Sequence, residues 1–484
     1  MICGMILSSA LLRMLGDTEY GIYQTVAAFA NHLILLEFGV GTVMVRNISM
    51  CRGRGASEEE IQLNITTNWT LTGMLAVLLL GVSVLLYYTI PSMYANSMTA
   101  AQIQHGQRIF AVSAVHLLTT FFIHTVNAVV LSFEDYTFGS LQSIIRTLAR
   151  STLLLVLMVW FRNALVIALV DMVLGTLCLF TSYQYCRKKL KVSLRFGKCD
   201  ADILRMSIPL ALAVFMQGIV GQANNNVAKV LIGIILSPES VSLYSVALYI
   251  YSIFSSLVNV ASAMYVPTVT QKIGQGMREK ELARELIVPC RLTALAGGLI
   301  LFGFVSVGRQ FVEILYGREY LLAWPMAIIL MAPAYIDTVV DVLVHVLSAI
   351  NKRMVRSAVL IMTTMLNIAF TVFCLDRWGV LGAAASTAGC TLIGPVLIMN
   401  VYYKKVVGIP ILWLFRQAFR GILIYMVLGC VTALGATSLI GNIYVSFLVG
   451  GAIFVCISMG GYFLFGMNGQ EKEKVKQLFR KKYK

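Results

Sequence analysis

Apolar and polar residues follow one another in long blocks along this chain, and the apolar blocks are long enough to cross a membrane as helices. Most of them hold 18–25 residues, and about 20 apolar helical residues span the roughly 30 Å of hydrocarbon in a bilayer. They lack the strict two-residue alternation of a membrane barrel. The pattern predicts fourteen transmembrane helices, over residues 1–15, 22–45, 64–88, 109–131, 141–160, 164–186, 208–235, 244–266, 292–315, 326–350, 358–375, 383–402, 421–439 and 444–466.

Lysine and arginine fall almost entirely on every second connection between these spans. The even-numbered connections and the C-terminal tail hold 29 of the 38 basic residues, whereas the odd-numbered connections hold four. Retained basic residues mark the cytosolic face of a membrane protein. We therefore expect residues 187–207 and the basic tail 467–484 to lie in the cytosol, together with both ends of the chain.

Composition supports an all-α integral membrane protein. Charged residues make up 12% of the chain and hydrophobic residues 58%, whereas soluble domains contain about 25% charged residues. The mean hydropathy is +0.82. The net charge of +16 is then mostly a topology signal that favours anionic membrane lipid, with no nucleic acid as partner. Residues 1–15 are short for a crossing, so we expect the first helix to begin upstream of this sequence.

Neither the cysteines nor the histidines suggest a metal or redox centre. The ten cysteines include no C-x-x-C pair, which favours free thiols. The chain also lacks the phosphate-binding, zinc-protease and serine-hydrolase motifs, and it has no soluble domain. We expect no enzyme activity and no cofactor. Two histidines of the span 109–131 are interpreted as ordinary satisfied side chains: His116 and His124.

The chain contains an internal repeat at an offset of about 220 residues. Leu15–Tyr23 and Leu236–Tyr244 are both acidic turns that end on a tyrosine, and Val130 and Val346 both begin a Val-Leu-Ser triplet. Six spans separate the copies, so both have the same orientation in the membrane. The predicted organisation is an N-lobe over 1–186, a linker over 187–207 forming an amphipathic membrane-surface helix, a C-lobe over 208–403, two additional helices over 404–466 and the tail 467–484.

Lys229 is the most informative charge within a span, because ionisable groups there usually face a wet cavity or the bundle interior. A helix turns by about 100° per residue, and three amides fall on the same face as this lysine. Amides and a cation suit a cavity that holds sugars and phosphates. The alternative is a lysine paired with a carboxylate purely for packing. The three amides are Gln222, Asn225 and Asn226.

Four arginines are further candidates for substrate contacts. Arg146 and Arg150 lie one turn apart in the span 141–160, Arg13 lies near the outer end of the first span, and Arg46 ends the second. Each has an ordinary alternative. Arg146 and Arg150 can snorkel to the membrane surface, and Arg46 can anchor the cytosolic end of its helix.

Acidic residues within the spans are candidates for ion coupling. Glu37 precedes two glycines, and Asp171 lies in the sixth span. Asp337, Asp341 and His345 share one helix face, and chains of carboxylate and imidazole groups carry protons in membrane transporters. The alternative for these three is a structural ion pair with cations of the N-lobe.

The opening of the chain resembles that of bacterial polysaccharide repeat-unit flippases, whose superfamily also includes the multidrug-and-toxin-extrusion (MATE) exporters and the lipid II flippases. The resemblance is carried by Leu12–Tyr23 (LRMLGDTEYGIY), Leu36–Gly41 (LEFGVG) and Val45-Arg46. Beyond these motifs it extends along the whole chain as a plan of 12 or 14 helices.

The resemblance implies a MATE-like flippase fold with two lobes around a cationic cavity. It implies alternating-access transport of undecaprenyl-diphosphate-linked oligosaccharide across the bacterial cytoplasmic membrane, driven by H⁺ or Na⁺, with polysaccharide polymerase machinery as a partner. Arg13 and Lys229 match cavity cations, and Glu37 matches the acidic position before the glycines. Two alternatives stay open: a MATE-like cation or drug antiporter, and a membrane polysaccharide polymerase or ligase.

Overall fold

The computed structural model describes residues 2–222, 226–263, 265, 279–349 and 353–468. The described residues contain helices and no strand, as the apolar pattern predicts. The chain divides into two compact units, Met1–Ser242 and Leu243–Lys484. This division lies beyond the predicted linker, so the two helices that follow the linker pack within the first unit. The predicted lobe boundaries stay a prediction.

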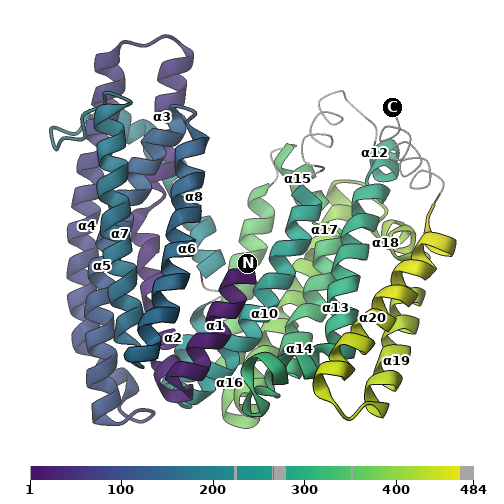
Figure 1. The fold of residues 1–484 in the computed structure, drawn as a ribbon. Helices are drawn as coiled ribbons and strands as arrows, with labels where there is room; N and C mark the ends of the chain where they lie inside the picture. Colours follow the sequence, from purple (N-terminus) through teal and green to yellow (C-terminus); the bar gives the residue numbers. More distant parts are fainter. Residues whose placement is uncertain (1, 223–225, 264, 266–278, 350–352, 469–484) are drawn as a thin grey trace. The chain divides into compact units, whose positions relative to one another are not determined.

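The first unit is a helical bundle in which α4, α5, α6 and α7 are antiparallel and long enough to cross a membrane (Figure 1). Its elements are α1 (Ile2–Leu15), α2 (Asp17–Leu33), η1 (Ile34–Glu37), α3 (Val40–Gly53), α4 (Glu58–Tyr94), α5 (Ala100–Ser132), α6 (Tyr136–Trp160), α7 (Leu165–Lys188), α8 (Ala201–Gln222) and α9 (Ala228–Ile235).

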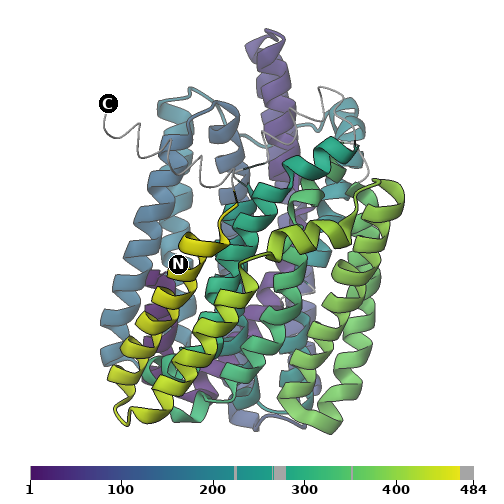
Figure 2. The same cartoon turned by 90° about the vertical axis from the view of Figure 1, so that its right-hand side faces the viewer.

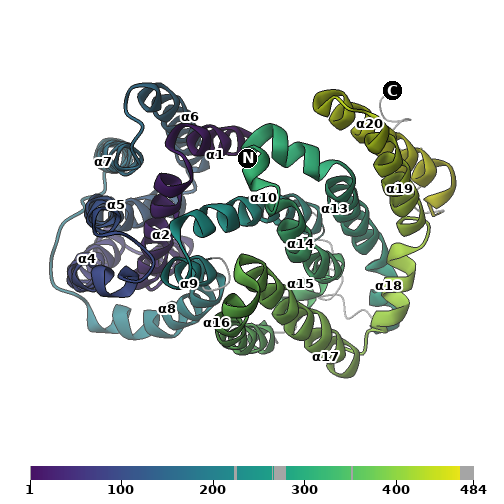
Figure 3. The same ribbon diagram turned by 90° about the horizontal axis from the view of Figure 1, so that it is seen from below.

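Helix α5 is the centre of this bundle. It packs against α2, α3, α4 and α7, and the end-on view in Figure 3 shows it among α4, α7 and α2. Its Phe110 and Phe121 are almost fully buried, together with Leu79 from α4. By contrast, α4 exposes Val77 and Leu85. Exposed apolar side chains on a helix of this length are suited to contact with lipid.

The second predicted span, 22–45, is interrupted near its middle. Helix α2 ends at Leu33, a 3₁₀ turn follows, and α3 begins at Val40. Phe38 and Gly39 both have left-handed backbone conformations, with φ of 51° and 68°. A continuous helix was therefore the wrong prediction here. The residues are apolar on both sides of the break, so hydropathy does not reveal it, whereas glycine permits the positive φ.

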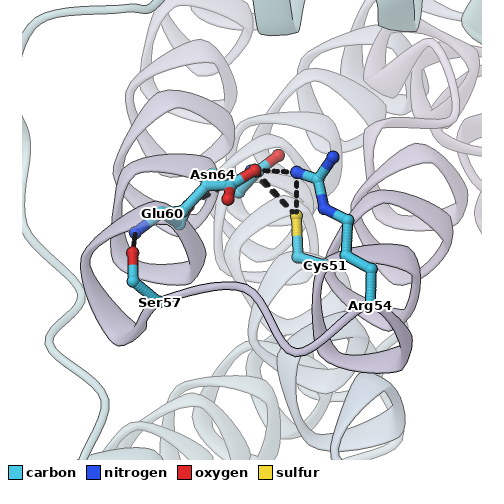
Figure 4. Close-up of polar contacts among 5 residues, drawn as sticks. All are labelled: Cys51, Arg54, Ser57, Glu60 and Asn64. Atoms are coloured by element: carbon cyan, nitrogen blue, oxygen red, sulfur yellow. Dashed lines mark hydrogen bonds and ion pairs between the residues drawn. The ribbon is translucent and has the colours of Figure 1, made fainter.

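A compact polar cluster closes the turn between α3 and α4 (Figure 4). Ser57 caps α4, because its hydroxyl accepts a hydrogen bond of 3.3 Å from the backbone N–H of Glu60. The Glu60 carboxylate pairs with the guanidinium of Arg54. The buried thiol of Cys51 lies 3.6 Å from Glu60 and from the amide of Asn64. These contacts fix the end of the broken α2–α3 segment onto the start of α4.

Residues 189–200 form an irregular strap that joins α7 to α8 along the side of α4. The predicted amphipathic helix in the linker is therefore wrong. Side chains of α4 satisfy the strap's backbone instead: Gln62 donates to the carbonyl of Ser193 at 2.5 Å and accepts from its N–H at 3.2 Å. Thr70 and Gly197 exchange a similar pair of bonds. Because these partners replace helical hydrogen bonds, the strap keeps an extended path.

The second unit is also wholly helical in its described part, and Figure 2 shows α19 and α20 side by side in yellow tones. Its elements are α10 (Pro238–Ala263, beginning in the first unit), α12 (Glu279–Glu285), α13 (Ile287–Tyr316), η3 (Arg318–Tyr320), α14 (Ala323–Val339), α15 (Val342–Ala349), α16 (Arg353–Thr391), η4 (Leu392–Ile398), α17 (Met399–Val406), α18 (Ile411–Phe419), α19 (Leu423–Leu439), α20 (Ile443–Gly461) and η5 (Tyr462–Gly466).

Arg291 holds together three helix ends in this unit. It is 3% exposed and lies in the first turns of α13. Its guanidinium donates to the carbonyls of Gln417 (3.0 Å), Arg420 (2.7 Å) and Gly466 (2.7 Å). The first two carbonyls lie where α18 ends before a 48° bend into α19. The last carbonyls of a helix have no hydrogen-bond donors within the helix, and the buried guanidinium of Arg291 donates to them instead.

The described residues contain ten helices that are long and apolar enough to cross a membrane, or eleven if the bent α18–α19 pair is one span. Fourteen were predicted. Helix α1 is too short to count, and the predicted span 208–235 includes residues outside the described part. Two other predicted spans, 358–375 and 383–402, merge into one segment, with a tight turn at Gly379 (φ 55°, ψ −142°) inside α16.

Candidate functional site

Most of the candidate residues lie in the first unit, where the charged side chains fall into two kinds. Some form ion pairs within the unit. Others have no carboxylate partner among the described residues. Since an unpaired charge within a span is costly, the second kind is the better indication of a binding site.

Arg150 belongs to the first kind. Its Nε and Nη2 atoms donate to the two carboxylate oxygens of Asp171 at 2.5 and 2.9 Å. Tyr23 of α2 also hydrogen-bonds this guanidinium. The side chains of Arg150 and Asp171 are 30% and 17% exposed. This two-point geometry neutralises both charges and leaves neither group free for a ligand. The pair joins α6 to α7, and Tyr23 connects it to α2.

Glu37 and His124 form a second pair, at the break between α2 and α3. His124 comes from α5, and its Nδ1 lies 2.6 Å from Oε2 of Glu37. The side chain of His124 is 43% exposed and that of Glu37 is 13% exposed. The break places the carboxylate beside the first turn of α3: a Cβ built at Gly41 would lie 3.3 Å from Glu37 Oε1. His124 was interpreted from sequence as an ordinary histidine, and the pairing was missed.

A groove of about 690 Å³ opens over this pair. Its polar lining includes Glu37, His124, Thr42, Arg46 and Asn127. Arg46 is exposed and makes no ion pair in the part of the chain that the structure describes. The Oδ1 atom of Asn127 is buried and has no hydrogen-bond partner among the described residues. Because His124 and Asn127 lie one turn apart on α5, their shared face is the signal by which sequence reasoning could have found this site.

Lys229 belongs to the second kind. It lies in α9 and donates a hydrogen bond of 3.1 Å to Oε1 of Gln24 on α2. Its partner is thus a neutral amide, and no described carboxylate pairs with it. Asn226 is 6% exposed beside it. Two further members of the predicted amide stripe, Asn225 and the side chain of Gln222, lie outside the described residues.

The two remaining basic candidates occupy different places. Arg146 is half-buried on α6 and makes no ion pair with any side chain that the structure describes. It lies close enough to His124 and His116 for its charge to act on both rings. Arg13 is exposed in the last turn of α1, a helix that packs against α6.

Asp337 of the predicted relay forms an ion pair, but its partner differs from the one that the sequence predicts. Asp337 pairs with Arg356 at 3.0 Å, and the side chains are 15% and 13% exposed. Tyr403 accepts a further bond of 3.4 Å from Arg356. The partner is thus a cation of the same unit and not one from the N-lobe. Asp341 is described, whereas the side chain of His345 lies outside the described part.

The described residues contain no group of three or more His, Cys, Asp or Glu side chains arranged to hold a metal ion. The site therefore offers cations, amides and one carboxylate–imidazole pair. Such a set can bind an anionic, hydroxyl-rich ligand and can exchange protons.

Comparisons with known proteins identify a family and a fold. A family model described as "Polysaccharide biosynthesis protein" matches residues 1–272. No curated protein sequence matches the chain.

Solved structures show the same fold at low identity. The lipid II flippase MurJ, in an inward closed conformation, has a TM-score of 0.72 at 14% identity, with 96% of each chain covered. An inward-facing MATE multidrug transporter of the MOP superfamily has a TM-score of 0.64 at 15% identity, covering 85% of this chain and 93% of that one. A MOP superfamily transporter from Pyrococcus furiosus has a TM-score of 0.55 at 13% identity, covering 86% and 91%. The likeness establishes a multi-pass membrane protein with the MurJ and MATE fold.

Proposed function

Because the chain belongs to the polysaccharide biosynthesis protein family, we propose that it flips undecaprenyl-diphosphate-linked oligosaccharide repeat units across the bacterial cytoplasmic membrane. The repeat units move from the cytosolic to the outer leaflet, where polymerase machinery consumes them. The basic connections and both chain ends lie in the cytosol in this proposal, as the charge pattern predicts.

One observation supports this function above the others: Lys229 lies in α9, within the predicted span 208–235, and its partner is the amide of Gln24 rather than a carboxylate. Arg150 and Arg356 show the alternative arrangement, in which a carboxylate of the same unit neutralises the cation. An uncompensated charge in a low-dielectric site costs several kcal/mol. An anionic ligand removes that cost, and a diphosphate is the anionic part of the proposed substrate.

Other groups of the first unit suit the same ligand. Arg46 and Arg146 have no ion-pair partner in the described part of the chain, and arginine binds phosphate through two parallel N–H donors. Asn226 is a candidate for the sugar hydroxyls, and so are Gln222 and Asn225. Arg13 is a further candidate at the end of α1, whereas the pairing of Arg150 argues for a structural role.

Transport against a gradient requires coupling to an ion, and five residues were predicted for it. Asp171 and Asp337 each accept hydrogen bonds from an arginine, so they are poor acceptors for a mobile ion. Asp341 and His345 stay candidates. Glu37 has the most suitable surroundings, since its partner is a titratable ring beside an open groove.

The test is polysaccharide export by Lys229 variants in cells that depend on this chain. Lys229→Arg keeps the charge and should keep most export, whereas Lys229→Ala should reduce export by about tenfold or more, as loss of one charge-assisted contact predicts. The matched control is Lys198→Ala, an exposed lysine of the strap, which should behave as the natural protein. Membrane abundance is measured for each variant. Full export by a normally abundant Lys229→Ala protein contradicts the proposal.

A further inference from the structure

The Glu37–His124 pair lies where a membrane span is broken. In transport proteins, interrupted spans expose backbone and side-chain groups to ions near the middle of the membrane. Here the 3₁₀ turn Ile34–Glu37 and the left-handed residues Phe38 and Gly39 separate α2 from α3. The free N–H groups at the start of α3 stabilise a negative charge nearby, and the Glu37 carboxylate lies beside them. The break therefore holds the Glu37 carboxylate in place within a span.

The other charged groups around the pair are few and are all basic. Arg46 lines the same groove from α3, and Arg146 acts on His124 from α6. His116 lies two turns before His124 on α5. Helix α8 contributes only Val214 and Gly218 to the described lining, and α4 contributes none of it. Within the described residues, Glu37 is thus the one acidic group that faces His124. The charges of Arg46 and Arg146, in contrast, disfavour a positive charge on the His124 ring.

The geometry suits a proton better than a sodium ion. Hard cations take several oxygen ligands, whereas imidazole nitrogen suits the softer transition metals. The ring nitrogen of His124 lies 2.6 Å from Oε2 of Glu37, so the nearest neighbour of this carboxylate oxygen is a nitrogen and not a further oxygen ligand. A proton, in contrast, is held between a carboxylate and an imidazole, and imidazole titrates near neutral pH.

We propose that Glu37 and His124 form a proton-binding site in the groove of the first unit, and that the coupling ion taken up there is H⁺ and not Na⁺. A proton taken up from solvent binds the lone pair of Nε2, the ring nitrogen of His124 that does not contact Glu37, and leaves an imidazolium beside the carboxylate. Coupling requires that the proton is released on the side of the membrane opposite to its uptake; after release the neutral ring remains hydrogen-bonded to Glu37.

Protonation of His124 and binding of the diphosphate favour each other, a link that rests on the proposed function. An anionic diphosphate in the groove is attracted by the additional positive charge of a protonated His124. By reciprocity, a bound diphosphate favours protonation by the same factor. Arg46 alone gives a constant attraction, whereas His124 makes the attraction depend on pH.

The first experiment needs no substrate. The full-length protein is purified in detergent with ¹⁵N-labelled histidine, and each ring is titrated from about pH 5 to about pH 8, the range in which imidazole changes charge. The resonance that disappears in His124→Asn should titrate at a lower pH in Glu37→Gln, because the neutral amide no longer favours the charged ring. The matched control is His116, which lies on the same helix and contacts the hydroxyl of Thr120; its midpoint should not change. A His124 midpoint that is indifferent to Glu37→Gln overturns the proposal.

The second experiment measures polysaccharide export in cells. His124→Asn, which retains a hydrogen-bonding side chain, should lower export by about tenfold, within the range typical of coupled sites, whereas His116→Asn should retain it.

Replacing external sodium by choline should leave export unchanged, and a protonophore should abolish it. Export that persists with the protonophore and follows the sodium gradient overturns the proposal. If the Lys229 test fails while the histidine titration succeeds, the substrate assignment is wrong and the proton site stands.

Discussion

Arg291 donates a hydrogen bond of 2.7 Å to the carbonyl oxygen of Gly466, which lies 175 residues further along the chain. The same guanidinium donates to the carbonyls of Gln417 and Arg420. A single buried side chain thus joins α13, the α18–α19 bend and the end of η5. In the sequence this arginine counts as one of many basic residues in a connection, and its role in packing becomes evident only from the three carbonyls around it.

Removing this guanidinium should destabilise the second unit. Arg291→Leu keeps the apolar stem and leaves three buried carbonyls unsatisfied, at about 1–3 kcal/mol for each group that finds no other partner. We expect a markedly lower thermal midpoint for the purified protein in detergent. Arg291→Lys, which restores one charged donor, should recover part of the loss. The exposed Arg416 provides the control, since Arg416→Leu should leave the midpoint near that of the natural protein.

The break between α2 and α3 should not tolerate a side chain at Gly39. Its φ of 68° is unfavourable for other residues, and a Cβ there would lie 2.4 Å from the side chain of Val214. Gly39→Ala should therefore lower both stability and export, by at least about 1 kcal/mol in stability. Gly81 is the matched control, because it lies inside α4 with nothing within 4 Å of an added Cβ. Gly81→Ala should be neutral or stabilising, and equal behaviour of the two variants would contradict the role of the break.

Asp135 gives the stability of the first unit a defined dependence on pH. The hydroxyl of Tyr185 and then Nζ of Lys189 hydrogen-bond this carboxylate and lower its pKa. Its contribution is complete above the ordinary carboxyl pKa of about 3.9 and is lost as the pH falls through the folded value. Tyr185 and Asp135 raise the pKa of Lys189, so that contribution is present up to about pH 10 and is lost as the pH rises through the folded value.

The matching experiment compares Asp135→Asn with the natural protein. Asparagine retains the cap on α6 but not the charge. The variant should have a lower thermal midpoint near neutral pH, and the difference should disappear at about pH 3, where the natural carboxylate is protonated as well. A difference that is the same at both pH values would show that the charge is not the cause.

The sequence predicts the helices well and their interruptions poorly, for a physical reason. Burial of apolar side chains in lipid is a local property, so hydropathy finds α4, α5 or α7 without knowledge of the fold. The break at Phe38 and Gly39 depends on close packing against Val214, and a span that is apolar throughout gives no sign of it. The strap at 189–200 depends likewise on side chains of α4, such as Gln62, that are distant in sequence.

In the candidate site, too, the sequence reveals some features and only the tertiary contacts reveal others. Charged residues within spans, such as Lys229 and Glu37, are conspicuous in the sequence, and the structure places both in the first unit. Which charges neutralise one another is a matter of tertiary contacts. Arg150 pairs with Asp171, Asp337 with Arg356, and these pairings distinguish structural cations from available ones. His124 lies 87 residues from Glu37, so its pairing with this carboxylate could not be inferred from the sequence, although the face that it shares with Asn127 is visible there.

Reconstitution of the purified protein in liposomes tests the central claim most directly. The probe is an undecaprenyl-diphosphate-linked oligosaccharide with a fluorophore on the sugar, present in both leaflets and reduced from outside by dithionite, which does not cross the membrane. Dithionite should reduce about half of the fluorophore in empty vesicles and nearly all of it with the natural protein, as expected of exchange between leaflets. Lys229→Ala should remain near half. If the natural protein leaves the inner-leaflet probe protected under an imposed proton gradient, this chain is not a flippase for lipid-linked oligosaccharide.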